Sequence, residues 1–225
     1  MGKITLLPET TKNPITLIGQ RAGICWGADI TDNEKNYKRG LDCLKSNHGR
    51  TFEYVNIEMI LEEYSARAIR EWYTHIGGMP TRLQESTRYV DCSNFDYVIP
   101  RTVKAIPKAL EVYNHIIQTI RDGYTELINL GIPKEDASMP LPFAMKTKMV
   151  DKRNLRNLIE MSHQRTCLRA YWEYRDIMHD LCIELSNYSE EWKTLLEMMF
   201  GAKCKFLGYC PEKYGCGAYP KKKES

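Results

Sequence analysis

The sequence lacks the features that place a protein in a membrane or on nucleic acid. It has no run of about 18 apolar residues, the length of a membrane-spanning helix, so we expect no membrane partner. The formal net charge is only +3, and charge therefore gives no indication of nonspecific nucleic-acid binding. The N-terminal stretch MGKITLLPETTKN lacks the basic, apolar and small-residue regions of a signal peptide. We therefore expect a cytoplasmic protein.

The cysteines lack the spacing of a metal framework. Eight cysteines are scattered along the chain, and without a secretion signal they are expected to be thiols rather than disulfides. Cys204, Cys210 and Cys216 follow one another at a spacing of six, whereas zinc sites use shorter cysteine pairs and a fourth ligand. A zinc site in the tail is the less favoured alternative. We expect no metal and interpret residues 201–225 as a Cys- and Lys-containing tail that packs or frays.

The remaining chain has enough apolar content for one domain. Its 225 residues are 43% hydrophobic. Short β-type runs come early, and long segments with helical spacing come late, which predicts an α+β fold with a small mixed or antiparallel sheet. Strands are predicted over residues 3–7, 15–18 and 55–61. Helices are predicted over residues 34–46, 66–73, 108–130, 154–165, 172–186 and 190–200. A single domain over residues 1–200 precedes the tail.

The stretch Arg70–Tyr89 joins an amphipathic run to a turn and a polar segment. Gly77-Gly78-Met79-Pro80 disfavours a continued helix. Five polar side chains then follow within seven residues: Arg82, Gln84, Glu85, Ser86 and Arg88. Guanidinium groups and hydroxyls hold phosphate oxygens through charge-assisted hydrogen bonds, so this segment suits an anion site. A solvated polar loop is the alternative, because short polar motifs often arise by chance.

This stretch resembles the signature region of the flavin-dependent thymidylate synthases. In that family an aromatic-ended helix runs into Arg-His-Arg, a loop and Glu-x-Ser-x-Arg-Tyr. The corresponding residues here are Thr74-His75-Ile76 and Gln84-Glu85-Ser86-Thr87-Arg88-Tyr89. The histidine and Ser-x-Arg-Tyr match. Both flanking arginines are absent, the acid before the serine has moved by one position, and the loop is two residues longer.

An earlier segment, Asn47–Tyr54, resembles the Gly-His-x-Thr-x-Phe-Glu-His box of the same family. His48, Phe52 and Glu53 match that box, and Arg50 stands where threonine is usual. A turn that ends one helix and leads into a strand is an interpretation compatible with the resemblance. The histidine and acid of the box lie near the flavin in the family.

The resemblance to this family covers about residues 15–200 in all. Its longest continuous part lies in a later segment. Gly131–Pro142 is similar to the family's Gly-x-Pro-x-x-x-Ala-Arg-x-x-Leu-Pro, with Ser138 in place of the arginine. From Leu141 through Glu173 the family pattern fits without a gap. It aligns Asn154-Leu155-Arg156 with an Asn-Ala-Arg box and Arg165 with a late catalytic arginine. A surface helix with solvated arginines is the alternative for residues 154–165.

The resemblance implies reductive methylation of dUMP to dTMP, with methylenetetrahydrofolate, NADPH and FAD, in a homotetramer whose active sites are shared between subunits. The implied catalytic residues are Arg165 and Ser86. The implied dUMP-binding residues are Arg70, Gln84, Glu85, Ser86, Arg88 and Arg165. The FAD-binding residues, including Arg82 as a hypothetical substitute for the missing arginines, are His48, Arg50, Glu53, Thr74, His75, Ile76, Arg82, Asn154 and Arg156.

Two other functions remain open from the sequence. One is a flavin- and folate-dependent enzyme for another pyrimidine nucleotide, such as a hydroxymethylase, which the changes at Ser138 and in the signature loop favour. The other is a non-catalytic nucleotide-binding relative. Retention of both Ser86 and Arg165 argues against a non-catalytic protein.

Overall fold

The computed structural model describes residues 2–222 of the chain. Its strands form one antiparallel sheet in the order β1-β2-β4-β3. The strands are β1 (Lys3–Leu6), β2 (Asn56–Ser65), β3 (Thr81–Gln84) and β4 (Lys146–Asn154). The predicted α+β class with a small antiparallel sheet is therefore confirmed.

Helices account for most of the remaining chain. The first half contains α1 (Pro14–Cys25), α2 (Asn33–Lys45), α3 (Gly49–Phe52) and α4 (Ala66–Tyr73). A separate group comprises α5 (Arg101–Lys104), α6 (Pro107–Asn129) and α7 (Lys134–Ala137). The second half ends with α8 (Leu155–Arg165), α9 (Trp172–Tyr188), α10 (Glu190–Met199) and α11 (Lys203–Leu207). Among residues 2–222, no helix is both long enough and apolar enough to cross a membrane.

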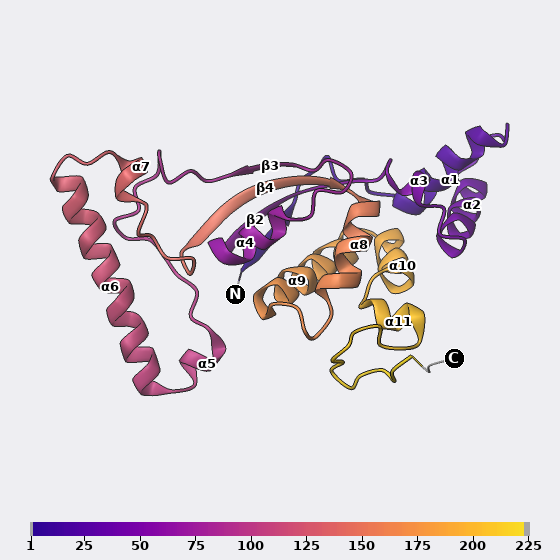
Figure 1. The fold of residues 1–225 in the computed structure, drawn as a ribbon. Helices are drawn as coiled ribbons and strands as arrows, with labels where there is room; N and C mark the ends of the chain where they lie inside the picture. The colour runs from indigo at the N-terminus through magenta and orange to yellow at the C-terminus, as the bar shows by residue number, and fades with distance from the viewer. Residues whose placement is uncertain (1, 223–225) are drawn as a thin grey trace.

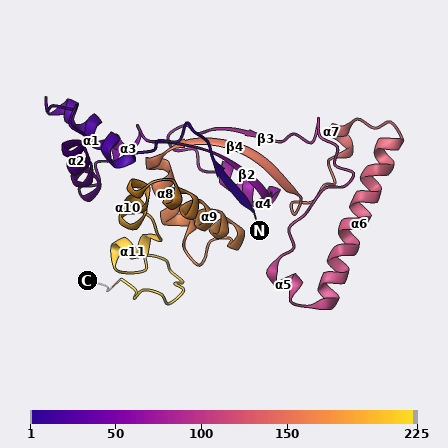
Figure 2. The same ribbon diagram turned by 180° about the vertical axis from the view of Figure 1, so that it is seen from behind.

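The molecule is elongated, with the sheet in its middle (Figure 1). Helices α4, α8, α9 and α10 lie on one side of the sheet, and α1–α3 gather at one end. Helix α6 stands at the opposite end with α5 and α7, and the view from behind confirms this separation (Figure 2). The main core lies between the sheet and the central helices. Its fully buried side chains include Ile57, Met59, Leu61, Trp72, Leu158, Ile177, Leu181 and Trp192.

Local sequence signals fix the junction between β2 and α4. Alternate residues of β2, namely Ile57, Met59 and Leu61, are fully buried, as the predicted half-buried strand requires. Ser65 then accepts a hydrogen bond of 3.1 Å from the Ala68 backbone N–H, which caps α4 as predicted. The Glu173 carboxylate binds both the backbone N–H and the hydroxyl of Ser65. This buried contact joins α9 to the start of α4.

The prediction of a strand over residues 15–18 is wrong, because these residues lie in α1. Pro14 stands in the first turn, where its missing N–H removes no helical hydrogen bond. Ile15, Ile18 and Ala22 are buried, and their spacing of three and four residues places them on one face. Taken alone, the run Ile15–Ile18 resembles a strand, and the helical spacing becomes visible only when Ala22 is included.

Strands β3 and β4 were not predicted. The sequence of β4, KTKMVDKRN, looks solvent-exposed, yet Thr147, Met149, Asp151 and Arg153 are all buried on one face. The polar segment that begins at Thr81 forms an edge strand on β4. The flexible turn before β3 is present, with Gly78 and Met79 both at positive φ.

The predicted long helix is α6, and its apolar stripe is largely exposed. Val112 and Ile116 are each 50% exposed, whereas Ile117 and Tyr124 are buried. Gly131, at φ +82°, follows its end as predicted. Within the described residues 2–222, helix α6 therefore leaves part of its apolar face exposed.

Candidate active site

The turn after α4 lies along α8 in the opposite direction. At the C-terminal end of α8, the Arg165 Nε donates a hydrogen bond of 2.9 Å to His75 Nε2. At the N-terminal end, a Cβ added to Gly78 would lie 2.3 Å from the Asn154 Nδ2 atom. Asn154 caps α8 by accepting a hydrogen bond of 2.9 Å from the Asn157 N–H. The two sequence segments predicted to bind FAD are therefore adjacent over the whole helix.

The His75–Arg165 cluster consists of His75, Arg165, Glu71 and Tyr174. Arg165 Nη1 lies 3.6 Å from the Glu71 carboxylate, and its guanidinium lies 5.0 Å from the centre of the Tyr174 ring. Burial, together with the charges of Arg165 and Arg153, lowers the pKa of His75 to about 4. His75 is thus neutral near pH 7 and accepts the hydrogen bond from Arg165 at Nε2. Arg165 is held as a fixed cation, which suits the stabilisation of negative charge on a reacting group.

A buried ion pair lies under this cluster. Asp151 and Arg153 are fully buried and joined by two hydrogen bonds of 2.5 Å and 2.7 Å. The Arg153 guanidinium lies 4.5 Å from the Trp72 ring, and Trp72 stacks on Tyr174 at 5.5 Å. The stacked rings of Trp72 and Tyr174 therefore lie between the guanidinium groups of Arg153 and Arg165. Sequence reasoning missed this support, because Asp151 and Arg153 look like solvent-exposed residues until each is seen paired with the other.

A second cluster, here the Arg156 cluster, contains Glu53, Arg156 and Glu160. The Arg156 guanidinium lies 2.6 Å from the Glu53 carboxylate and 3.7 Å from that of Glu160. Beside it, His48 is exposed just before the short helix α3, and Arg50 is exposed within that helix. The structure thus places the Asn47–Tyr54 box next to the start of α8.

A third cluster, here the loop cluster, contains Ser86, Thr87, Arg88, Glu135 and Ser138. Arg88 Nε lies 3.3 Å from the Glu135 carboxylate, and the Thr87 and Ser138 hydroxyls lie 3.3 Å apart. Ser86 Oγ accepts a hydrogen bond of 3.3 Å from the Arg88 N–H. The signature loop and the Gly131–Pro142 segment are therefore neighbours.

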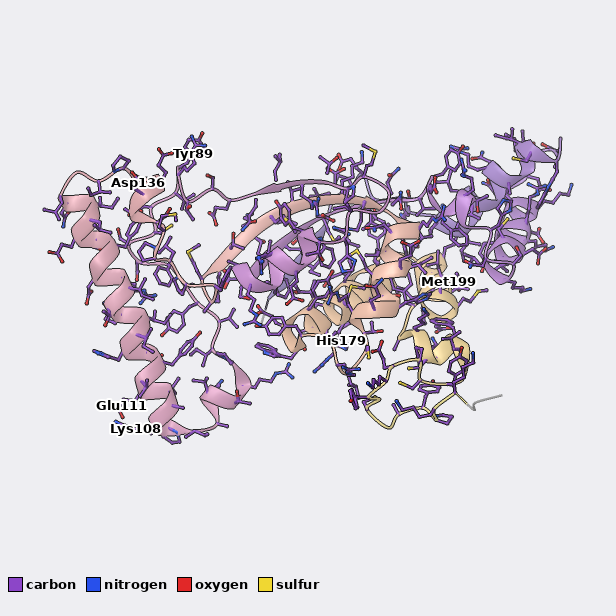
Figure 3. The ribbon with its side chains drawn as sticks, viewed as in Figure 1. Tyr89, Lys108, Glu111, Asp136, His179 and Met199 are labelled. Carbon is purple, nitrogen blue, oxygen red and sulfur yellow. The ribbon has the colours of Figure 1, made fainter. Side chains whose placement is uncertain are left out.

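The loop cluster lies near α7, at the end of the molecule that Tyr89 and Asp136 mark in Figure 3. Two other predicted dUMP-binding residues lie between this end and the centre. Gln84 donates a hydrogen bond of 3.2 Å to the Thr147 hydroxyl, and Arg70 is exposed over the Phe143 ring at 5.8 Å. These two side chains are not in the loop cluster itself.

The length of β4 separates the loop cluster from the Arg156 cluster. The Glu85 N–H donates a hydrogen bond of 2.9 Å to the Lys148 carbonyl, and Asn154 lies six residues further along the strand. At about 3.3 Å per residue, six residues span roughly 20 Å. Within residues 2–222, the predicted phosphate-binding residues therefore lie apart from the Arg156 cluster.

Comparison with known proteins accounts for these segments together. A family model described as "Thymidylate synthase complementing protein" matches residues 6–188. A flavin-dependent thymidylate synthase from Nitratidesulfovibrio vulgaris is 32% identical over 193 residues, which is 79% of this chain and 74% of the relative. The chain belongs to the flavin-dependent thymidylate synthase family.

Other members of the family match nearly the whole chain. A flavin-dependent thymidylate synthase from Pyrococcus furiosus is 29% identical over 224 residues, which is 95% of this chain and 91% of the relative. A solved structure of a UMP/dUMP methylase, PolB from Streptomyces cacaoi, bound with 5-Br dUMP, aligns with a TM-score of 0.72. It covers 88% of this chain and 95% of its own chain at 16% identity, which shows a shared fold. Family membership makes the chain an enzyme of the flavin-dependent methyltransferase class.

This member of the flavin-dependent thymidylate synthase family has few charges in its altered signature. The Thr74 hydroxyl donates to the Glu71 carbonyl, and Ile76 is 70% exposed. Arg82 donates a hydrogen bond of 2.7 Å to the Tyr73 carbonyl and lies 4.4 Å from the Tyr73 ring. The Arg82 guanidinium is thus engaged at the end of α4.

Two larger cavities lie near α8–α10. The larger, about 690 Å³, lies between α9 and α10 and contains none of the predicted site residues. The other, about 500 Å³, has Arg165 in its wall. Among residues 2–222, no group of three or more His, Cys, Asp or Glu side chains is arranged to hold a metal ion.

Proposed function

We propose that this chain is a flavin-dependent thymidylate synthase that converts dUMP to dTMP. Methylenetetrahydrofolate supplies the methylene carbon, and FAD, reduced by NADPH, supplies the hydride. The observation that carries the proposal is the hydrogen bond between His75 and Arg165. It joins the segment that resembles the flavin signature to the residue that resembles the catalytic arginine, although 90 residues separate them in the sequence. Catalysis is assigned to residues 1–200.

The residues around the start of α8 suit FAD. A flavin diphosphate needs cations and amides, and this region offers the exposed Arg50, the 48%-exposed Arg156 side chain and the Asn154 amide. Because Gly78 has no side chain, its backbone can lie next to the Asn154 amide, where a Cβ would collide. When bound, the cofactor supplies the redox chemistry, and the protein supplies binding and orientation. Arg82 already donates a hydrogen bond to the Tyr73 carbonyl, whereas Arg50 is exposed. Arg50 is therefore the better substitute for the missing signature arginines.

The loop cluster suits the dUMP phosphate. Ser86 and Arg88 offer a hydroxyl and a guanidinium at the surface, and the Glu135 contact of Arg88 is an exposed ion pair that a phosphate can replace. Arg165 is assigned to the pyrimidine carbonyl oxygens, where a fixed cation stabilises negative charge on the activated ring. Neutral His75 orients Arg165 without adding a second positive charge.

Self-association fits the distribution of these groups. The predicted phosphate-binding loop and the Arg156 cluster lie roughly 20 Å apart along β4, so a compact site needs a second chain to supply one of them. The exposed stripe with Val112 and Ile116 on α6 gives an apolar surface for such an association. A homotetramer with shared active sites accounts for both features.

Ser138 favours a second candidate, a flavin- and folate-dependent enzyme such as a pyrimidine hydroxymethylase. The hydroxyl of Ser138 contacts Thr87 in the loop cluster, where the family's arginine would add a cation. A site with one cation fewer can accept a different nucleotide. The product then distinguishes the two candidates.

The purified protein tests the proposal in two steps. A flavin absorption band near 450 nm that shifts when dUMP is added is the expected spectrum, since the cofactor carries out the redox step. Turnover with methylenetetrahydrofolate and NADPH should then give dTMP by mass spectrometry. A product heavier by one oxygen atom would favour the hydroxymethylase. A colourless protein that takes up no FAD would refute both.

A further inference from the structure

The cavity of about 500 Å³ lies between the end of α8 and the C-terminal tail. Arg165, Arg169 and Cys167 line it from the α8 side, while Lys203 and Glu212 line it from the tail. The family match ends at residue 188, so the tail wall lies outside the matched segment. The cavity is of the size that binds small molecules or parts of them.

The tail wall is held in place by specific contacts. The Phe206 ring lies 4.7 Å from the His163 ring, and His163 Nε2 lies 3.2 Å from the Met199 carbonyl. Arg169 Nη1 lies 3.0 Å from the Glu212 carboxylate. The Cys210 N–H donates a hydrogen bond of 2.7 Å to the Pro220 carbonyl. The tail therefore docks on the end of α8 and forms a defined wall.

The charge of the cavity is positive. Three cations line it, Arg165, Arg169 and Lys203, against the single carboxylate of Glu212. Burial lowers the pKa of His163, so its ring adds no charge near pH 7. No carboxylate within residues 2–222 lies within 4 Å of the Lys203 ammonium. This lysine is free to pair with a ligand.

We propose that this cavity binds the anionic end of a co-substrate, through carboxylate or phosphate oxygens that meet Lys203 and Arg169. The inference rests on the proposed function, because Arg165 faces both the cavity and the His75–Arg165 cluster. A co-substrate anchored here lies next to the group assigned to the pyrimidine. Two co-substrates carry such ends: the glutamyl carboxylates of the folate and the phosphates of NADPH.

The test uses two stable probes, pteroylpentaglutamate and NADP⁺, titrated into the full-length protein by isothermal titration calorimetry. Lys203→Ala should weaken binding of one probe about fivefold, since it removes a partly exposed cation from an anion. Glu212→Gln should strengthen the same binding about threefold, because it removes the one acid and frees Arg169. Lys213→Ala, a tail lysine outside the cavity lining, is the matched control and should leave both affinities unchanged. The probe that responds identifies the ligand.

Opposite shifts for Lys203→Ala and Glu212→Gln are required. Shifts in the same direction, or no shift for either probe, would overturn the inference, as would a wild-type protein that binds neither. Near-ultraviolet circular dichroism of each variant checks that the tail tyrosines keep their packing. Turnover of dUMP is measured separately. Failure of turnover with the expected binding pattern therefore refutes the proposed function, whereas turnover without that pattern refutes the cavity assignment.

Discussion

Replacing Gly78 with alanine tests whether the turn after α4 and the start of α8 work as one unit. Gly78 has φ +71°, a backbone conformation that costs an L-residue about 1 kcal/mol. The new Cβ would lie 2.3 Å from the Asn154 Nδ2 atom, closer than real Cβ contacts allow. Asn154 must then move, and its cap on α8 contributes about 1 kcal/mol. We expect Gly78→Ala to lower the free energy of unfolding by about 2 kcal/mol, the sum of these two contributions.

The control is Gly27→Ala. Gly27 also has positive φ, at +60°, but a Cβ there would meet nothing within 4 Å. Gly27→Ala should therefore lower the free energy of unfolding only by the backbone cost of positive φ, about 1 kcal/mol. Urea titration at one fixed protein concentration measures both variants. FAD titration should show weaker binding for Gly78→Ala alone. Equal losses of stability with unchanged FAD affinity would refute the coupling between Gly78 and Asn154.

Three further outcomes follow from the centre of the site. Because the pKa of His75 is about 4 in the folded protein, the unfolded chain binds a proton below pH 6.5 that the folded chain excludes, so stability should fall from pH 6.5 to 4. His75→Gln should remove that part of the pH dependence of the free energy of unfolding, measured by denaturation at several pH values. Asp151→Asn leaves Arg153 buried without its charge partner and should cost about 3–5 kcal/mol in urea titration. Glu34→Gln, which breaks an exposed pair, should cost under about 1 kcal/mol; similar losses would contradict the buried-pair argument. Arg165→Met should lower kcat about 100-fold or more in single-turnover assays while FAD stays bound, and a smaller loss would remove Arg165 from catalysis.

Elements with a complete local signal were predicted from the sequence. The alternation in β2 and the Ser65 cap of α4 each need only neighbouring residues, and both are present. Pro107 and Gly131 likewise bound the long helix α6 within a residue or two. Which part of the α6 stripe is buried was not predictable, because that depends on what lies opposite it.

The errors arise where a residue's partner is distant or unusual. β4 was missed because Asp151 and Arg153 look solvated, whereas each makes the other acceptable in the core. The run at Ile15–Ile18 was assigned to a strand because four residues do not show a helical period. In the site, the family resemblance pointed to His75 and Arg165, and these two residues do meet. Their support by Trp72 and Tyr174 needed the fold.

The Asp151–Arg153 pair also restricts how this lineage can change. Either residue replaced alone leaves a buried charge without its partner, so every single-step path away from the pair passes through a destabilised protein. Simultaneous replacement by apolar residues of similar volume avoids that intermediate. We therefore expect positions 151 and 153 to covary among close homologues, with the two charges present or absent together, even though neither side chain reaches the surface.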